Sequence, residues 1–195
     1  MRITAKGISK SYTRRSRTID ALKSADIELK SGSLTVIFGR SGSGKTTLMN
    51  ILSGLLKPGT GSVFFDDTDI YSLTDKELSL LRSREIGYVP QGHSGLSTLT
   101  VRENILLPAA VVRNENAPEK ADELMKRFGL AELSSAYPEE LSGGELRRLA
   151  IARALINSPH AVFADEPTND LDDENTRLVF RLLKNTAEEG AAVIV

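Results

Sequence analysis

The spacing of hydrophobic and polar residues divides the chain into segments with the periods of strands and helices. Hydrophobic residues alternate with polar ones over residues 3–8 and 25–29, which predicts antiparallel strands with one buried face. Residues 34–38 form a continuous apolar and β-branched run, which predicts a central parallel strand buried on both faces. Similar runs at 161–164 and 191–195 predict two further buried strands.

Helical patterns lie between these strands. Hydrophobic residues recur at helical spacing over 48–56, and Pro58-Gly59 then predicts the end of that helix. Further helices are predicted by capping boxes and apolar stripes at Thr74 with Glu77, Thr100 with Glu103, 124–130 and 146–155. The order of elements predicts an α/β fold: a parallel core, an N-terminal antiparallel β subdomain and an inserted helical subdomain at about 91–157. We expect residues 1–195 to form a single domain.

Composition narrows the possible functions. The 195 residues are 40% hydrophobic and 26% charged, as in a soluble globular chain, and the net charge of −1 argues against a generally basic nucleic-acid binder. The absence of cysteine excludes disulfides and thiol chemistry, and His93 and His160 are too far apart to suggest a histidine metal site. Any metal would therefore have oxygen ligands. No apolar stretch predicts a signal peptide or a spanning helix, so we expect a cytosolic chain.

Residues 39–46 carry the most specific motif. Their sequence, Gly-Arg-Ser-Gly-Ser-Gly-Lys-Thr, has the pattern Gly-x-x-x-x-Gly-Lys-Ser/Thr between a predicted strand and a predicted helix. Glycines let successive N–H groups surround a phosphate, and the helix N-terminus adds partial positive charge. Lys45 would reach the terminal phosphates and Thr46 would ligate Mg²⁺. The alternative is a simple glycine-rich turn with a solvated lysine. The predicted nucleotide-binding residues here are Gly39, Ser41, Gly42, Ser43, Gly44, Lys45, Thr46 and Thr47.

Later motifs distinguish among proteins with such a loop. Leu-Ser-Gly-Gly-Glu at 141–145 precedes a helical run, and Asp165-Glu166-Pro167-Thr168 follows the strand at 161–164, with Asn-Asp-Leu-Asp at 169–172. With the phosphate loop first, then Gln91 and then these motifs in this order, the chain resembles an ATP-binding-cassette (ABC) ATPase over essentially its whole length. A finer resemblance, to ATPase subunits of lipoprotein-release, macrolide-export and cell-division systems, is carried by residues 10–12, 47–52, 73–82, 86–87 and 100–104.

The resemblance implies roles for individual residues. Glu166 would be the general base that deprotonates the attacking water, with Lys45 and Gln91 as the other catalytic residues. Asp165, Gln91 and Thr46 would hold Mg²⁺ and its water shell. Tyr12 would stack on adenine; the structural alternative is a tyrosine on an edge strand without a ligand. For Asp165 the structural alternative is a carboxylate that caps the next turn. The basic group Arg14, Arg15 and Arg17 is expected to form a solvated loop.

The segment 141–145, called the signature below, has two interpretations that do not exclude each other. Ser142 and Glu145 form a capping box by sequence. The resemblance implies that Ser142, Gly143 and Gly144 close on the γ-phosphate of ATP bound to a second subunit, with Asp172 as a dimer contact. The active unit would then be a head-to-tail dimer. Glu145 stands where the family usually has glutamine, and Asn169 where glycine is more common.

The resemblance also implies a partner and a place of action. We expect MgATP-driven action on a separate membrane permease, peripheral attachment at the inner face of the cell membrane, and no direct nucleic-acid contact. The family's switch histidine would follow residue 195, so we expect a shortened cassette with weakened hydrolysis. The alternatives are an ABC ATPase acting on nucleic acid or ribosomes, an ATP-sensing regulatory module, and a small-molecule kinase, which would leave the signature unexplained.

Overall fold

The computed structural model describes residues 1–14, 17–92 and 94–195, and the predictions for Arg15 and His93 lie outside these ranges, as do the side chains of Arg14 and Arg17. An antiparallel sheet of order β2-β1-β4-β5 occupies the N-terminal part. Its strands are β1 (Arg2–Arg14), β2 (Arg17–Lys30), β4 (Thr60–Phe65) and β5 (Thr68–Asp69). Ile3, Ala5 and Ile8 are buried on one face of β1, which confirms the predicted alternation.

A second sheet of order β3-β8-β7-β6 is parallel throughout. Its strands are β3 (Leu34–Thr35), β6 (Ile86–Val89), β7 (Ala161–Ala164) and β8 (Ala192–Ile194). Every residue of β7 is buried, and the strand divides its side chains between two cores. Ala161 and Phe163 join the core around α1, whereas Val162 and Ala164 join the core under the other helices. Burial on both faces explains why the run at 161–164 is continuously hydrophobic.

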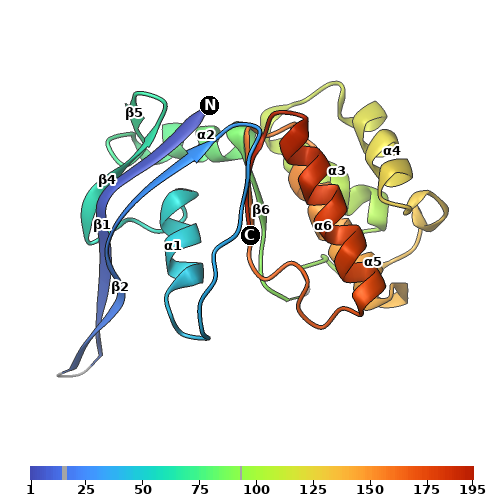
Figure 1. Ribbon diagram of the computed structural model, residues 1–195. Coiled ribbons are helices and arrows are strands. Elements are labelled where there is room, and N and C mark those ends of the chain that lie inside the picture. The colour runs from blue at the N-terminus through green and yellow to red at the C-terminus, as the bar shows by residue number, and fades with distance from the viewer. Residues whose placement is uncertain (15–16, 93) are drawn as a thin grey trace.

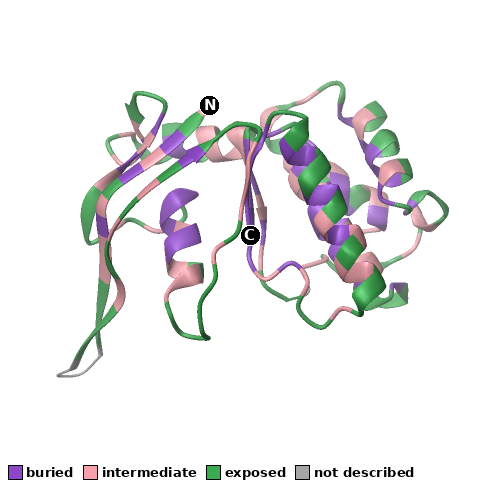
Figure 2. Ribbon diagram, viewed as in Figure 1, coloured by how far each residue is buried: buried purple, intermediate pink, exposed green. Residues whose placement is uncertain are grey.

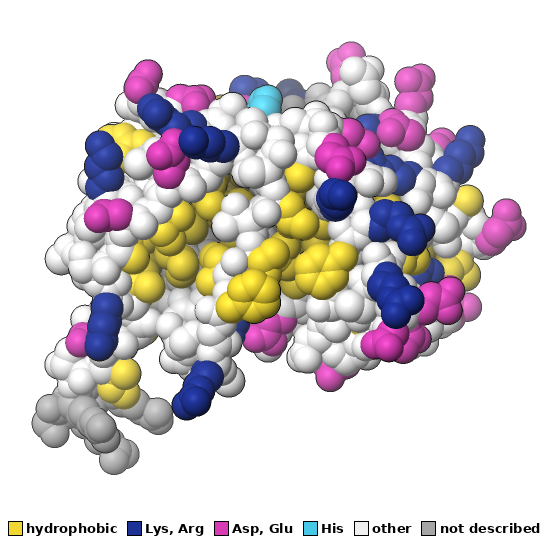
Figure 3. Space-filling model, in the orientation of Figure 1, with side chains coloured by type: hydrophobic (Ala, Val, Ile, Leu, Met, Phe, Trp, Pro, Cys, Tyr) yellow, Lys and Arg dark blue, Asp and Glu magenta, His cyan; other side chains and the backbone are white. Residues whose placement is uncertain are grey.

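The prediction of a buried central strand over 34–38 is wrong. Only Leu34–Thr35 form a strand, and they lie at the edge of the parallel sheet with β8 as the neighbour. The Ile37 N–H still donates to the Val195 carbonyl at 2.7 Å, but Val36 is 39% and Phe38 88% exposed. Hydrophobic side chains lie in the middle of the face shown in Figure 3. Beyond the end of β3, Ile37 packs partly against the core around α1, whereas Val36 and Phe38 belong to neither hydrophobic core of the described residues.

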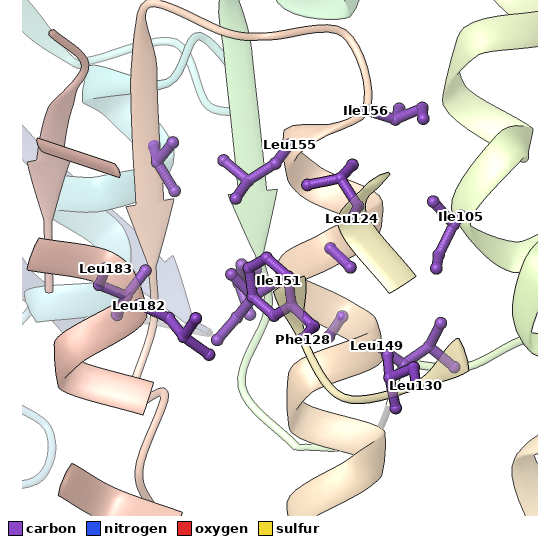
Figure 4. Packing of buried hydrophobic residues seen from close by; sticks show 14 of the residues in the cluster. Ile105, Leu124, Phe128, Leu130, Leu149, Ile151, Leu155, Ile156, Leu182 and Leu183 are labelled. Carbon is purple, nitrogen blue, oxygen red and sulfur yellow. The ribbon is translucent and has the colours of Figure 1, made fainter. Parts of the chain in front are cut away.

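Six helices complete the described part of the fold (Figure 1). The helix α1 (Lys45–Leu52) lies between the two sheets, and its buried face carries Leu48, Met49, Ile51 and Leu52. The other helices are α2 (Asp75–Glu85), α3 (Val101–Val112), α4 (Ala117–Arg127), α5 (Gly143–Leu155) and α6 (Asp173–Glu188), with short 3-10 turns at Ala131–Leu133 and Pro138–Glu140. Side chains from α3, α4, α5 and α6 pack together in one core (Figure 4), and α6 turns an exposed stripe to solvent (Figure 2).

The predicted helix over 48–56 ends early. The chain leaves α1 after Leu52 because Gly54 adopts a left-handed backbone at φ 72°, and Leu55 is 52% exposed. Two side chains satisfy the carbonyl groups at this end. The Tyr71 hydroxyl lies 2.6 Å from the carbonyl oxygens of Ile51 and Leu56, and Arg82 Nη1 donates to the Gly54 carbonyl at 2.8 Å. These contacts fix the C-terminal end of α1 to α2.

The predicted capping boxes are confirmed. Thr74 and Glu77 open α2, and Thr100 and Glu103 open α3. In each pair the glutamate N–H donates to the threonine hydroxyl oxygen, and the threonine N–H donates to the glutamate carboxylate. These bonds lower the pKa of both glutamates. Local residue pairs therefore determine where these helices begin.

Candidate functional site

The phosphate loop, residues 39–46, joins β3 to α1 and borders a cavity of about 270 Å³. Ser41, Gly42, Gly44, Lys45, Thr46 and Thr47 line this cavity, together with Ala21, Gln91 and Glu166. Gly44 caps α1 in a left-handed conformation, and a Cβ there would collide with the Ala21 carbonyl oxygen on β2. Glycine is therefore required both by the turn and by the close approach of the antiparallel sheet. The N-terminus of α1 faces an anion-sized space.

The predicted catalytic residues come together at this cavity. Gln91, which follows β6, donates from Nε2 to Glu166 Oε2 at 2.7 Å. Lys45 Nζ lies 3.8 Å from Glu166 Oε1 and donates to the loop carbonyls of Gly39 and Arg40 at 2.9 and 3.3 Å. Glu166 has a left-handed backbone at φ 48°, which an ordinary residue adopts only when its surroundings impose it. A carboxylate beside a lysine and an amide can accept a proton from water held at the same place.

The residues predicted to hold a metal occupy adjoining positions. Asp165 directly follows β7, is 2% exposed, and lines a small cavity with Lys45 and Glu166. Its charge adds to the effect of burial in raising the pKa of Tyr88 to about 12. Thr46 and Gln91 line the neighbouring phosphate cavity. A hydroxyl, an amide and a carboxylate supply the oxygen donors that Mg²⁺ prefers, so this set fits the ion.

The signature lies at the N-terminus of α5, away from the phosphate cavity. Glu145 accepts hydrogen bonds from the Ser142 hydroxyl at 2.7 Å and the Ser142 N–H at 2.8 Å, and both bonds lower the pKa of Glu145. The capping-box interpretation of this segment is confirmed. In Figure 1 the start of α5 and the phosphate loop lie at opposite sides of the chain, and the signature does not line the phosphate cavity. Within one chain, therefore, Ser142 does not meet the nucleotide-binding loop.

Two other predicted contacts have local roles in the structure. Asp172 is the N-cap of α6 and accepts from the Asn175 N–H at 2.7 Å, which contributes most to lowering the pKa of Asp172. Tyr12 is 45% exposed on β1, opposite Ile19, with Lys10 Nζ 5.8 Å from its ring centre. Tyr12 does not line the phosphate cavity among the described residues. The roles of Asp172 at a dimer interface and of Tyr12 at adenine stay predictions.

Sequence reasoning missed two residues at the site. Ala21 lines the phosphate cavity from β2, and no pattern in its own segment indicated this. Arg147 is 5% exposed although arginine is rarely buried. Arg147 lies three residues after Gly144 on α5, and residues three or four apart share a helix face. This spacing could have suggested that Arg147 is buried together with Gly144.

No helix in the described residues is both long and apolar enough to span a membrane.

Comparisons with known proteins agree on one family. The ABC transporter family matches residues 22–169. The lipoprotein-releasing system ATP-binding protein LolD of Syntrophotalea carbinolica is 42% identical over 188 residues, which cover 95% of this chain and 83% of that protein. The bacitracin export ATP-binding protein BceA of Halalkalibacterium halodurans is 38% identical over 99% of this chain and 77% of that protein. The dimeric post-hydrolysis structure of the ATP-binding cassette MJ0796 bound to ADP and Pi has a TM-score of 0.90 at 36% identity, covering 99% of this chain and 86% of that one.

Proposed function

This chain belongs to the ABC transporter family, and from that premise we propose that it hydrolyses MgATP to drive a separate permease of the export or lipoprotein-release type. One observation carries the proposal: Lys45, Gln91 and Glu166 meet beside the phosphate loop. The chain binds ATP as a subunit of a transporter, as the family does. The matched relatives support a transporter and give no support to the nucleic-acid alternative.

The residues at the phosphate loop divide the work of binding and hydrolysis. The loop N–H groups and Lys45 hold the phosphates, and Lys45 exchanges its bonds to loop carbonyls for bonds to phosphate oxygens. Thr46, Gln91 and Asp165 would hold Mg²⁺, and the bound ion would neutralise part of the phosphate charge. Glu166 orients a water molecule and accepts its proton at a carboxylate oxygen, while Gln91 holds the other oxygen by its amide.

A second copy of the chain completes the site. Ser142, Gly143 and Gly144 lie away from the phosphate loop of their own chain, and the N-terminus of α5 suits a phosphate of the other subunit. Asp172, at the nearby start of α6, would contact the partner subunit. Closure of two chains on two nucleotides therefore gives two composite sites.

The remaining roles follow from the placement of the elements. Tyr12 would stack on adenine, since its strand neighbours on β2 lead directly to Ala21 at the phosphate cavity. The helical subdomain, about 91–157, would pass nucleotide-driven movement to the permease. The chain would accordingly act in the cytoplasm, held at the inner face of the cell membrane by that permease.

The experiment that tests the catalytic proposal is Glu166→Gln. We expect the variant to lose about 10²–10⁴-fold in ATP hydrolysis, because the base is removed while the amide keeps the shape of the side chain. Binding of MgATP should be retained or rise by up to about fivefold, since Lys45 loses a competing carboxylate at 3.8 Å. ATP-driven dimers should accumulate in size-exclusion chromatography.

Glu132→Gln is the matched control, because Glu132 is an exposed glutamate in the 3-10 turn Ala131–Leu133. Hydrolysis by Glu166→Gln at the parental rate would remove Glu166 from the proposed role. Co-purification with a permease encoded beside this chain tests the partner, and a consistent failure to recover one would contradict that part of the proposal.

A further inference from the structure

Arg147, a buried residue of α5, contacts the segment that leads into Gln91. We infer that Arg147 is a positioning residue that holds the segment of Gln91 and the turn after Glu166 in a fixed relation to the signature helix. The inference rests on the proposed catalytic roles of Gln91 and Glu166. It gives the signature, which we propose meets the second subunit's ATP, a direct connection to the hydrolytic residues of its own chain.

Two hydrogen bonds connect α5 to the proposed base. Arg147 Nη1 donates to the Pro90 carbonyl at 3.2 Å, and Pro90 immediately precedes Gln91. Gln91 Nε2 then donates to Glu166 Oε2 at 2.7 Å. Because the Pro90 carbonyl belongs to the peptide that leads into Gln91, a displacement of the guanidinium would change where the amide is presented to Glu166.

The turn that follows Glu166 carries a carboxylate near Arg147. Burial lowers the pKa of Arg147, and the carboxylate of Asp170 acts in the opposite direction. The turn is compact, since the Asn169 N–H donates to the Glu166 carbonyl at 3.2 Å and Asp170 has a left-handed backbone at φ 61°. Hydrogen bonds and a nearby opposite charge both stabilise a buried charge, so Arg147 favours the arrangement that keeps its bond to the Pro90 carbonyl and keeps Asp170 near it.

Neighbouring arginines of α5 make different contacts. Arg153 donates to the Ser94 carbonyl at 2.6 Å and to its hydroxyl at 2.8 Å, which holds the far end of the segment after β6. Arg148 donates to Asn175 Oδ1 at 3.0 Å at the start of α6. Arg147 is the member of this set that donates to the Pro90 carbonyl, next to Gln91. A shift of α5 would therefore reach Gln91 and Glu166 mainly through Arg147.

The test compares Arg147→Met, which removes the donor and the charge but keeps an unbranched apolar side chain, with Arg147→Lys, which keeps a charged donor on a long side chain for the Pro90 carbonyl. For Arg147→Met we expect kcat for MgATP to fall about tenfold with KM within about twofold, because misplacement affects the chemical step more than binding. Hydrogen exchange of 90–94 and 166–171 should rise, while that of 39–46 stays unchanged. Arg147→Lys should recover kcat to within about threefold of the parent. Arg181→Met, at an exposed position on α6, is the control.

Exchange in both segments at the parental rate in Arg147→Met, or an equal loss of kcat in the Lys and Met variants, would overturn the inference. Should Arg147→Met fail to fold, Asp170→Asn decides the question, since an exposed turn position tolerates asparagine. It should raise exchange at 166–171 without changing KM, and parental exchange there would contradict the proposal. The exchange result does not depend on turnover, so failure of the proposed role of Glu166 is recognised separately from failure of this one.

Discussion

The two glycines that open α5 allow folding to be separated from ATP-driven closure. A Cβ added at Gly143 would meet nothing within 4 Å, whereas one at Gly144 would lie 2.5 Å from Oδ1 and 2.7 Å from Cγ of Asn175. Neither position has a positive φ, so alanine can adopt both backbone conformations. Packing within the chain therefore explains a glycine at 144 and does not explain one at 143.

The structure sets the size of each effect. Gly143→Ala should raise the free energy of unfolding by about 0.4–1 kcal/mol, because alanine restricts the unfolded chain. Gly144→Ala has the same gain but overpacks the contact, which costs about 1–3 kcal/mol. Asn175 must then move away from Arg148 and Asp172, to which it is bonded at 3.0 Å each, and each lost bond costs about 0.5–1.5 kcal/mol. We expect a net loss of about 1–6 kcal/mol for Gly144→Ala, depending on whether both bonds are lost.

We expect ATP-driven dimerisation to be affected differently from stability in the two glycine variants. The open space beside Gly143 is where we propose that the second subunit's nucleotide approaches, and a methyl group there would obstruct it. Gly143→Ala should therefore fold at least as well as the parent and yet fail to form ATP-driven dimers. Gly144→Ala should be impaired in both respects.

Urea unfolding measures the first effect, and size-exclusion chromatography with ATP in a Glu166→Gln background measures the second. Asn175→Ala removes the clashing side chain, so the double variant with Gly144→Ala should lose less stability than the sum of the single changes. Equal stability losses for the two glycine variants would refute the packing argument. Normal dimers of Gly143→Ala would refute the proposed contact.

Three further predictions concern hydrogen bonds described above. Glu145→Gln removes a negative charge from the N-terminal end of α5, where we propose that the second subunit's phosphate approaches, and keeps an acceptor for Ser142. The dissociation constant of the ATP-driven dimer should therefore fall about threefold at low ionic strength and less in high salt. Tyr71→Phe leaves carbonyl oxygens at the end of α1 without their hydroxyl donor and should lower the free energy of unfolding by about 1–3 kcal/mol in urea titrations; no change would mean that water replaces the hydroxyl. The hydroxyl and N–H of Thr74 hold the pKa of Glu77 below its ordinary value of 4.5, so this contribution to stability is complete above that value and is lost as the pH falls below it. Glu77→Gln should reduce the drop in melting temperature between about pH 5 and pH 3.5, and an unchanged drop would contradict the linkage.

Features determined by residues close in sequence were predictable. The capping boxes depend on a hydroxyl and a carboxylate three residues apart, and the helices begin where those pairs stand. The phosphate loop needs its glycines, lysine and threonine in one short segment. The meeting of Gln91 with Glu166, which are 75 residues apart, could be expected only through the resemblance to a family.

Features determined by distant neighbours were not predictable from local patterns. The run from Leu34 has the composition of a central strand, but its place at the edge depends on which strands pair with it. The burial of Arg147 depends on Pro90, a residue 57 positions away, whose carbonyl accepts a hydrogen bond from the guanidinium. The early end of α1 depends on Tyr71, a residue of another segment, as well as on the adjacent Gly54.

The helix α1 is too short to be stable alone, since it has eight residues, and it is anchored at both ends. The phosphate cavity lies at one end, and the Tyr71 hydroxyl and the Arg82 guanidinium lie at the other. Any ligand that binds only the folded loop adds its binding free energy to the stability of this helix. Bound nucleotide would therefore slow amide exchange and proteolysis, relative to the nucleotide-free chain, at the far end of α1 where it meets α2.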